Sequence, residues 1–148
     1  MMNRKKNKII FACTFVIVLL LDQGSKYLAE TYLQAQNSDF GLGLGFSLAH
    51  NTGCAWGFFR NSAFFLALAG IVALGIIFWK RHLFNIYQRP IAFSLLLAGT
   101  LGNVIDRICY GFVIDFIDID LQIYRWPTFN IADLVLCISV ITLLITNR

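Results

Sequence analysis

The chain has 148 residues, of which 58% are hydrophobic and 14% are charged, with a mean hydropathy of +0.70. Soluble domains carry about 25% charged residues, so this composition excludes an ordinary soluble enzyme and predicts an integral membrane protein. The length fits one domain over residues 1–148, without a separate soluble unit.

Four hydrophobic segments are predicted to be membrane-spanning helices, with rough limits 9–28, 62–79, 91–109 and 131–147. Each is within about two residues of the ~17–25 that a crossing helix needs. The first segment also has features of a secretory signal, because its apolar run follows a basic stretch. No small-x-small cleavage pattern follows it, so we expect a retained span. The predicted fold class is an all-α membrane protein with four transmembrane helices.

Basic residues predict the orientation of these spans. The N-terminus holds Arg4, Lys5, Lys6 and Lys8, and the 80–90 connection holds Lys80, Arg81 and Arg89, whereas the 29–61 segment has only Arg60. Short cytoplasmic segments retain Lys and Arg, so both termini are predicted to be cytoplasmic and segments 29–61 and 110–130 to face outward. The net charge of +4 then reflects topology and contact with anionic inner-leaflet lipid, and nucleic acid is not implied.

Carboxylates gather near the ends of the spans. Five of the eight acidic residues are placed there: Asp22, Asp106, Asp115, Asp118 and Asp133. An ionised carboxylate near hydrocarbon costs at least ~2.5 kcal/mol, so such residues usually serve a pathway, a structural pair or catalysis. In the predicted topology all of them except Asp118 converge near the outer boundary. We predict that Asp115 and Asp133 form a catalytic pair.

The two outward segments are predicted to contain strands. Residues 116–124 alternate, with Phe116, Asp118, Asp120, Gln122 and Tyr124 on one face and Ile117, Ile119, Leu121 and Ile123 on the other. This pattern predicts a strand with one wet face, on which Asp118 and Asp120 are solvated. Asp115 belongs to the apolar face, where partial desolvation raises the pKa of a carboxyl.

The glycine-rich stretch 39–60 also favours strands. Its aromatic side chains Trp56, Phe58 and Phe59 suit the bilayer interface. Two interpretations are open: the stretch is an interfacial patch, or it is a platform that receives an extended polypeptide or lipid.

Asp133 lies just where the last apolar run begins. With Asn130 as the N-cap, Asp133 is the third helical residue, where a carboxylate meets free backbone donors and the positive end of the helix dipole. Capping is therefore one role for Asp133 and catalysis another, and the two are compatible.

Two further polar groups are predicted at span ends. Asn103, Asp106 and Arg107 have helical spacing, and a buried polar network is a plainer explanation for them than direct chemistry. Asp22 and Lys26 form an i, i+4 pair in the favourable order for a salt bridge, so mutual neutralisation near the membrane is their plain interpretation.

Five motifs occur in order along the chain. They are Asp22-Gln23-x-Ser25-Lys26, Asn51-Thr52-Gly53-Cys54-Ala55-Trp56-Gly57, Gly102-Asn103-x-Ile105-Asp106-Arg107, Gly111-x-Val113-Ile114-Asp115-Phe116 and Phe129-Asn130-Ile131-Ala132-Asp133. In order and spacing the chain resembles the lipoprotein signal peptidase family, also called signal peptidase II, over about residues 22–133. One small departure is Cys54, where the family commonly has alanine or valine.

The resemblance implies a bacterial inner-membrane aspartyl endopeptidase. Such an enzyme removes the signal peptide from prolipoproteins on the N-terminal side of the lipobox cysteine, after that cysteine has received diacylglycerol. It also implies a four-helix membrane core with a small outer β-rich cradle. The family's catalytic pair falls on Asp115 and Asp133. Substrate-binding or supporting residues would be Asp22, Lys26, Asn51, Gly53, Asn103, Asp106, Arg107 and Asn130.

Peptide hydrolysis by two close carboxylates needs one ionised and one protonated group. The helix start favours an ionised Asp133 as the base, and the apolar face favours a protonated Asp115 as the acid. Coupled carboxylates share their titration, and bound substrate can reverse these roles.

No metal or organic cofactor is predicted, because His50 and His82 fall on opposite membrane sides and no HExxH motif occurs. The cysteines Cys13, Cys54, Cys109 and Cys137 show no CxxC spacing; a Cys54–Cys109 bridge fits the topology but nothing indicates it. Expected partners are a diacylglyceryl-modified prolipoprotein and membrane lipid, with the enzyme as a monomer.

The alternative function is an ion or proton transporter that uses the intramembrane carboxylates. A non-enzymatic membrane scaffold is a third interpretation, although it leaves the polar residues at one depth unexplained.

Overall fold

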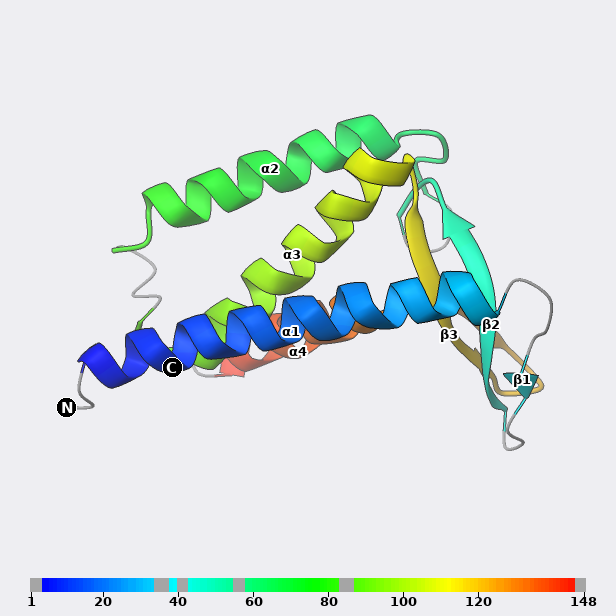
Figure 1. Ribbon diagram of the computed structural model, residues 1–148, viewed down its shortest axis with the longest axis horizontal. Coiled ribbons are helices and arrows are strands. Elements are labelled where there is room, and N and C mark those ends of the chain that lie inside the picture. Colours follow the sequence, from blue (N-terminus) through cyan, green and yellow to red (C-terminus); the bar gives the residue numbers. More distant parts are fainter. Residues whose placement is uncertain (1–3, 34–37, 40–42, 55–57, 83–86, 146–148) are drawn as a thin grey trace.

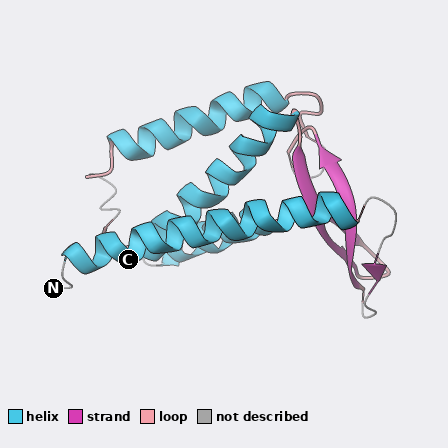
Figure 2. Cartoon of the chain, viewed as in Figure 1, coloured by secondary structure: helices cyan, strands magenta, loops and turns pink. Residues whose placement is uncertain are grey.

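The computed structural model describes residues 4–33, 38–39, 43–54, 58–82 and 87–145. Within these ranges lie four helices, α1 (Arg4–Tyr32), α2 (Ala63–Trp79), α3 (Pro90–Tyr110) and α4 (Ile131–Ile145), and four strands, β1 (Ser38–Asp39), β2 (Leu44–Asn51), β3 (Val113–Asp120) and β4 (Arg125–Phe129). The sheet lies across one end of the helices, and the start of α1 and the end of α4 lie toward the other end (Figure 1). Helices and strands are therefore segregated along the long axis (Figure 2).

Each predicted span overlaps a helix, and residues 146–147 of the fourth span lie outside the described part of the chain. α1 is longer than predicted, with 29 residues that continue through the polar positions after Leu21. α1 and α3 are long and apolar enough to cross a membrane, whereas α2 and α4 are shorter apolar helices. Large apolar side chains are exposed along α1, α2 and α4, as expected for helices in contact with lipid. That all four helices cross a bilayer stays a prediction.

α3 is the central helix and contacts the other three. Small residues allow close approach: a Cβ on Gly99 would lie 2.7 Å from the Ala132 carbonyl oxygen, and one on Gly102 would lie 2.3 Å from Asp22 Oδ2. Such small residues are typical of helix interfaces in membranes. α3 ends at Gly111, which takes the left-handed conformation with φ 80° and turns the chain into β3.

The sheet is antiparallel with the strand order β1-β2-β3-β4. The register of β2 against β3 pairs Ala49 with Asp115 and Asn51 with Val113. Asn51 is therefore a diagonal neighbour of Asp115, within reach of its side chain. The predicted strands in the outward segments are confirmed.

The predicted wet face of residues 116–124 is wrong. β3 ends at Asp120, and the remaining residues form the turn into β4, so Ile123 is 96% exposed instead of facing a core. Phe116 is buried, with its ring centroid 6.1 Å from that of Phe46. Asp118 is also buried, because the hairpin returns Arg125 over it in an ion pair. Asp120 is exposed, as predicted.

The glycine-rich stretch contains β2 and the end of β1. Gly43 has φ 74°, and a Cβ there would lie 1.8 Å from the Asp120 carbonyl oxygen, so only glycine fits. Phe58 and Phe59 are exposed, and Trp56 lies outside the described residues. The choice between interfacial patch and binding platform stays open.

Candidate active site

Asp115 lies near the start of β3 and is 2% exposed. Its two carboxylate oxygens accept hydrogen bonds from different elements. Asn51 Nδ2 donates to Oδ2 at 2.9 Å from the end of β2, and Asn130 Nδ2 donates to Oδ1 at 2.7 Å from the residue before α4. The carboxyl group is thereby held in one orientation.

Asp133 lies in the first turn of α4. Its backbone N–H donates to Asn130 Oδ1 at 2.9 Å, which confirms the predicted N-cap. Its Oδ1 accepts a hydrogen bond from Asn103 Nδ2 of α3 at 2.8 Å. The Asn130 side chain therefore connects the two acids: its Oδ1 accepts the hydrogen bond from the Asp133 backbone N–H, and its Nδ2 donates to the Asp115 carboxyl.

The electrostatic environment of Asp115 disfavours its ionised form. Burial, followed by the charge of Asp133, raises the pKa of Asp115 to about 7, although the hydrogen bonds from Asn51 and Asn130 and the charge of Lys26 act in the opposite direction. The predicted desolvation is confirmed. Repulsion between the two carboxylates also means that they lie close enough to interact.

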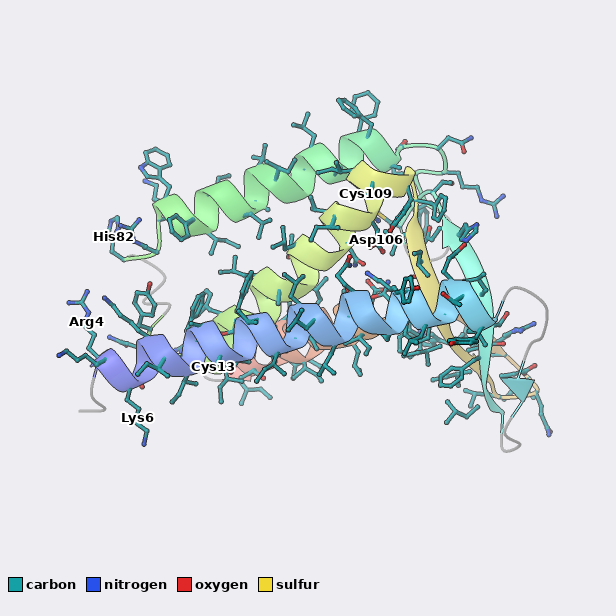
Figure 3. All side chains as sticks on the ribbon, in the orientation of Figure 1. Arg4, Lys6, Cys13, His82, Asp106 and Cys109 are labelled. Atoms are coloured by element: carbon teal, nitrogen blue, oxygen red, sulfur yellow. The ribbon has the colours of Figure 1, made fainter. Side chains whose placement is uncertain are left out.

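A buried ionic network lies behind the pair. Lys26 is 1% exposed, and its Nζ lies 2.8 Å from Asp22 Oδ2 and 2.9 Å from Asp106 Oδ2. It also donates to Asn103 Oδ1 at 3.1 Å. The predicted Asp22–Lys26 pair is confirmed, and Asp106 joins it from α3. Figure 3 shows Asp106 near the end of the helices that meets the sheet.

The network also includes Gln23, which belongs to the first of the five motifs but is not among the predicted site residues. Gln23 Nε2 lies 3.1 Å from Asp22 Oδ2 and 3.0 Å from Asp106 Oδ1. The sequence signal was its position beside Asp22, but helical spacing alone does not show that its side chain turns toward α3.

Arg107 and Gly53 tie the loop after β2 to α3. Arg107 donates to the Gly53 carbonyl oxygen at 2.9 Å and to the Asn103 carbonyl oxygen at 3.3 Å. The Gly53 N–H donates to Asn51 Oδ1 at 3.0 Å, which orients the Asn51 amide toward Asp115. All ten predicted site residues thus belong to one connected set of hydrogen bonds and ion pairs: Asp22, Lys26, Asn51, Gly53, Asn103, Asp106, Arg107, Asp115, Asn130 and Asp133.

Other reactive side chains lie apart from this set. Among the described residues no group of three or more His, Cys, Asp and Glu is arranged to hold a metal ion, and the four cysteines are free. His50 Nε2 lies 3.0 Å from Glu30 Oε2 on the sheet side, whereas His82 lies at the opposite end of the helices with Arg4 and Lys6 (Figure 3).

The chain is similar to known proteins along most of its length. A family model described as "Signal peptidase (SPase) II" matches residues 14–147. A lipoprotein signal peptidase of Thermodesulfovibrio yellowstonii is 39% identical over 88% of this chain and 89% of its own length. One of Blochmanniella pennsylvanica is 35% identical over 84% of this chain and 80% of its own length. A solved structure described as a bacterial membrane enzyme superposes with a TM-score of 0.82 at 34% identity, covering 91% of this chain and 85% of that chain.

Proposed function

The chain belongs to the signal peptidase II family, and we propose that it cleaves the signal peptide from diacylglyceryl-modified prolipoproteins with Asp115 and Asp133 as its catalytic pair. The observation that carries this proposal is the bridge made by Asn130, which binds the Asp133 backbone and the Asp115 carboxyl at once. This bridge fixes the Asp115 carboxyl relative to the Asp133 backbone, and Asn103 holds the Asp133 carboxylate, as acid and base must be held for hydrolysis.

The proposed reaction uses the two acids in opposite protonation states. Asp133 accepts a proton from water while the water oxygen attacks the scissile carbonyl carbon, and Asp115 gives its proton to the carbonyl oxygen. The tetrahedral intermediate then breaks its C–N bond. Asp133 returns the proton to the leaving amine, and Asp115 recovers its own proton from the hydroxyl group.

Local environment supports this assignment of roles. With its pKa raised to about 7 by burial and by the charge of Asp133, Asp115 keeps its proton below neutral pH and is about half protonated at pH 7. Asp133 lies in the first turn of α4, where the helix dipole favours a negative charge. The raised pKa of Asp115 therefore supports its role as the acid, and the position at the start of α4 supports Asp133 as the base.

The location of the site suits a lipid-modified substrate. Basic side chains lie at the end of the helices away from the sheet, including the labelled Arg4 and Lys6 (Figure 3). By the positive-inside rule this end is cytoplasmic, so both termini face the cytoplasm and the pair lies near the outer face of the inner membrane. A diacylglyceryl cysteine keeps its acyl chains in that leaflet, which brings the peptide bond on its N-terminal side to the depth of Asp115 and Asp133.

The test is cleavage of a prolipoprotein by the purified chain in liposomes, with and without the diacylglyceryl group on the lipobox cysteine. We expect mass spectrometry to find a mature product that begins with the modified cysteine, no product from the unmodified form, and no inhibition by EDTA. Cleavage at another bond, equal cleavage of the unmodified form, or loss of activity with EDTA contradicts the proposal. In the last case, carboxylate-bound cations and the transporter alternative are tested next, by ion flux in the same liposomes.

A further inference from the structure

Two buried carboxylates outside the proposed pair hold the backbone just before each member of that pair. Asp22 Oδ1 accepts the Ala132 N–H at 2.8 Å, and Asp106 Oδ2 accepts the Ile114 N–H at 3.2 Å. Ala132 directly precedes Asp133, and Ile114 directly precedes Asp115. The places of the two acids therefore depend on where Asp22 and Asp106 lie.

Two side chains of α1 join Asp22 to Asp106. Lys26 lies within 2.9 Å of both carboxylates, and the Gln23 amide nitrogen lies 3.1 Å from one and 3.0 Å from the other. The Lys26 ammonium offsets the repulsion between the carboxylates, but it is a compact charge with rotatable donors. The Gln23 amide is planar, with two N–H groups in fixed directions, so it limits how far apart the carboxylates can lie.

We infer that Gln23 is a positioning residue of the reaction, whose amide sets the separation of Asp22 and Asp106 and thereby that of Asp133 and Asp115. This inference rests on the proposed function of the two acids. Within the described part of the chain Gln23 makes no hydrogen bond to either acid, so its effect passes through the backbone of Ala132 and Ile114.

α3 packs closely against Asp22 and limits the movement of its side chain. A Cβ on Gly102 would lie 2.3 Å from Asp22 Oδ2 and 3.6 Å from Ala132 Cβ. Asp22 therefore fits closely between α3, the Gln23 and Lys26 side chains and the start of α4. Because α3 leaves little room around Asp22, a displacement of Asp22 caused by a change at Gln23 also moves Ala132, whose N–H donates to Asp22. A misplacement of about 1 Å at a reacting group costs on the order of 100-fold in rate.

The test compares Gln23→Met with wild type in the cleavage assay. Methionine is close to glutamine in length and removes the amide. The matched control is Gly24→Ala, the next residue on the same helix, where a Cβ meets nothing within 4 Å. We expect kcat to fall by roughly 10- to 100-fold with KM within about threefold of wild type, because the change acts on the positions of the two acids. Gly24→Ala is expected to keep wild-type kcat.

The pH profile separates positioning from a merely structural role. The charge of Asp133 helps raise the pKa of Asp115, so acids that move apart repel less and Asp115 loses its proton at lower pH. In Gln23→Met the high-pH decline of kcat is expected to move down by at least about half a pH unit. A kcat like that of wild type, or a lower kcat with an unchanged pH profile, overturns the inference.

A second variant decides the matter if Gln23→Met does not fold. A Cβ on Gly102 would lie 2.3 Å from Asp22 Oδ2, so Gly102→Ala displaces Asp22 directly and is expected to give the same fall in kcat and the same displaced pH profile. An unchanged profile in a folded Gly102→Ala protein refutes the inference. Failure of the proposed function looks different, since wild type then cleaves nothing, or Asp115→Asn and Asp133→Asn cleave normally.

Discussion

The protonation of Asp115 makes the stability of the fold depend on pH in a defined direction. Below about pH 4 the carboxyl group is protonated in both the folded and the unfolded chain. Between its ordinary pKa and about 7, the unfolded chain ionises while the folded chain keeps the proton. The folded state then binds more protons, so the free energy of unfolding falls as pH rises through this range.

The size of this effect follows from the pKa of Asp115. Its value of about 7 lies about three pH units above the ordinary value of an aspartate, and each unit is worth about 1.4 kcal/mol. The loss is therefore on the order of 4 kcal/mol between pH 4 and pH 7. For a chain of this size it corresponds to a decrease on the order of 10 °C in Tm. Because Asp115 is 2% exposed, solvent screening reduces it little.

Asp115→Asn removes the titrating group, so this variant lacks that part of the pH dependence. The assay is thermal unfolding in detergent from pH 4 to pH 8 for wild type, Asp115→Asn and the control Asp120→Asn, whose carboxyl group is exposed. We expect the difference in Tm between Asp115→Asn and wild type to shift in favour of Asp115→Asn as pH rises. The difference in Tm between Asp120→Asn and wild type is expected to stay constant over the same pH range. Parallel curves of Tm against pH for wild type and Asp115→Asn contradict a raised pKa of Asp115 in the folded chain.

Three further outcomes are expected. The cleavage rate falls about tenfold per pH unit above about 7 as Asp115 loses its proton; a rate that still rises from pH 7 to pH 9 contradicts the assigned role. Lys26→Met lowers the free energy of unfolding by about 3–5 kcal/mol, because two buried carboxylates lose their cation, whereas the exposed Lys6→Met changes it little; equal Tm values for the two variants contradict this. Gly99→Ala lowers Tm because its Cβ would lie 2.7 Å from the Ala132 carbonyl oxygen, whereas Gly75→Ala, with nothing within 4 Å, does not; the opposite order contradicts the packing described.

The sequence predicted the helices well because their hydrophobic runs are long. It also predicted the N-cap at Asn130 and the Asp22–Lys26 pair, since both depend on residues within one helical turn. The motif resemblance selected the ten site residues, which come together in the structure although they come from five different elements and the segments between them.

Contacts between distant segments were harder to predict. The apolar alternation of residues 116–124 continued into the turn after Asp120, so it gave the wrong exposure for Asp118, whose partner Arg125 comes from the returning strand. The role of Gln23 likewise depends on Asp106, 83 residues away. Helical spacing places residues on a face but does not identify the neighbouring helix.

The most direct test of the account is cleavage of a diacylglyceryl-modified prolipoprotein by purified wild type, Asp115→Asn, Asp133→Asn and the exposed control Asp120→Asn. All four proteins are first shown to be folded by their thermal unfolding. Both Asp115→Asn and Asp133→Asn are expected to lose product formation, while Asp120→Asn keeps the wild-type rate. Near-normal cleavage by either Asp115→Asn or Asp133→Asn contradicts the assignment of the catalytic pair.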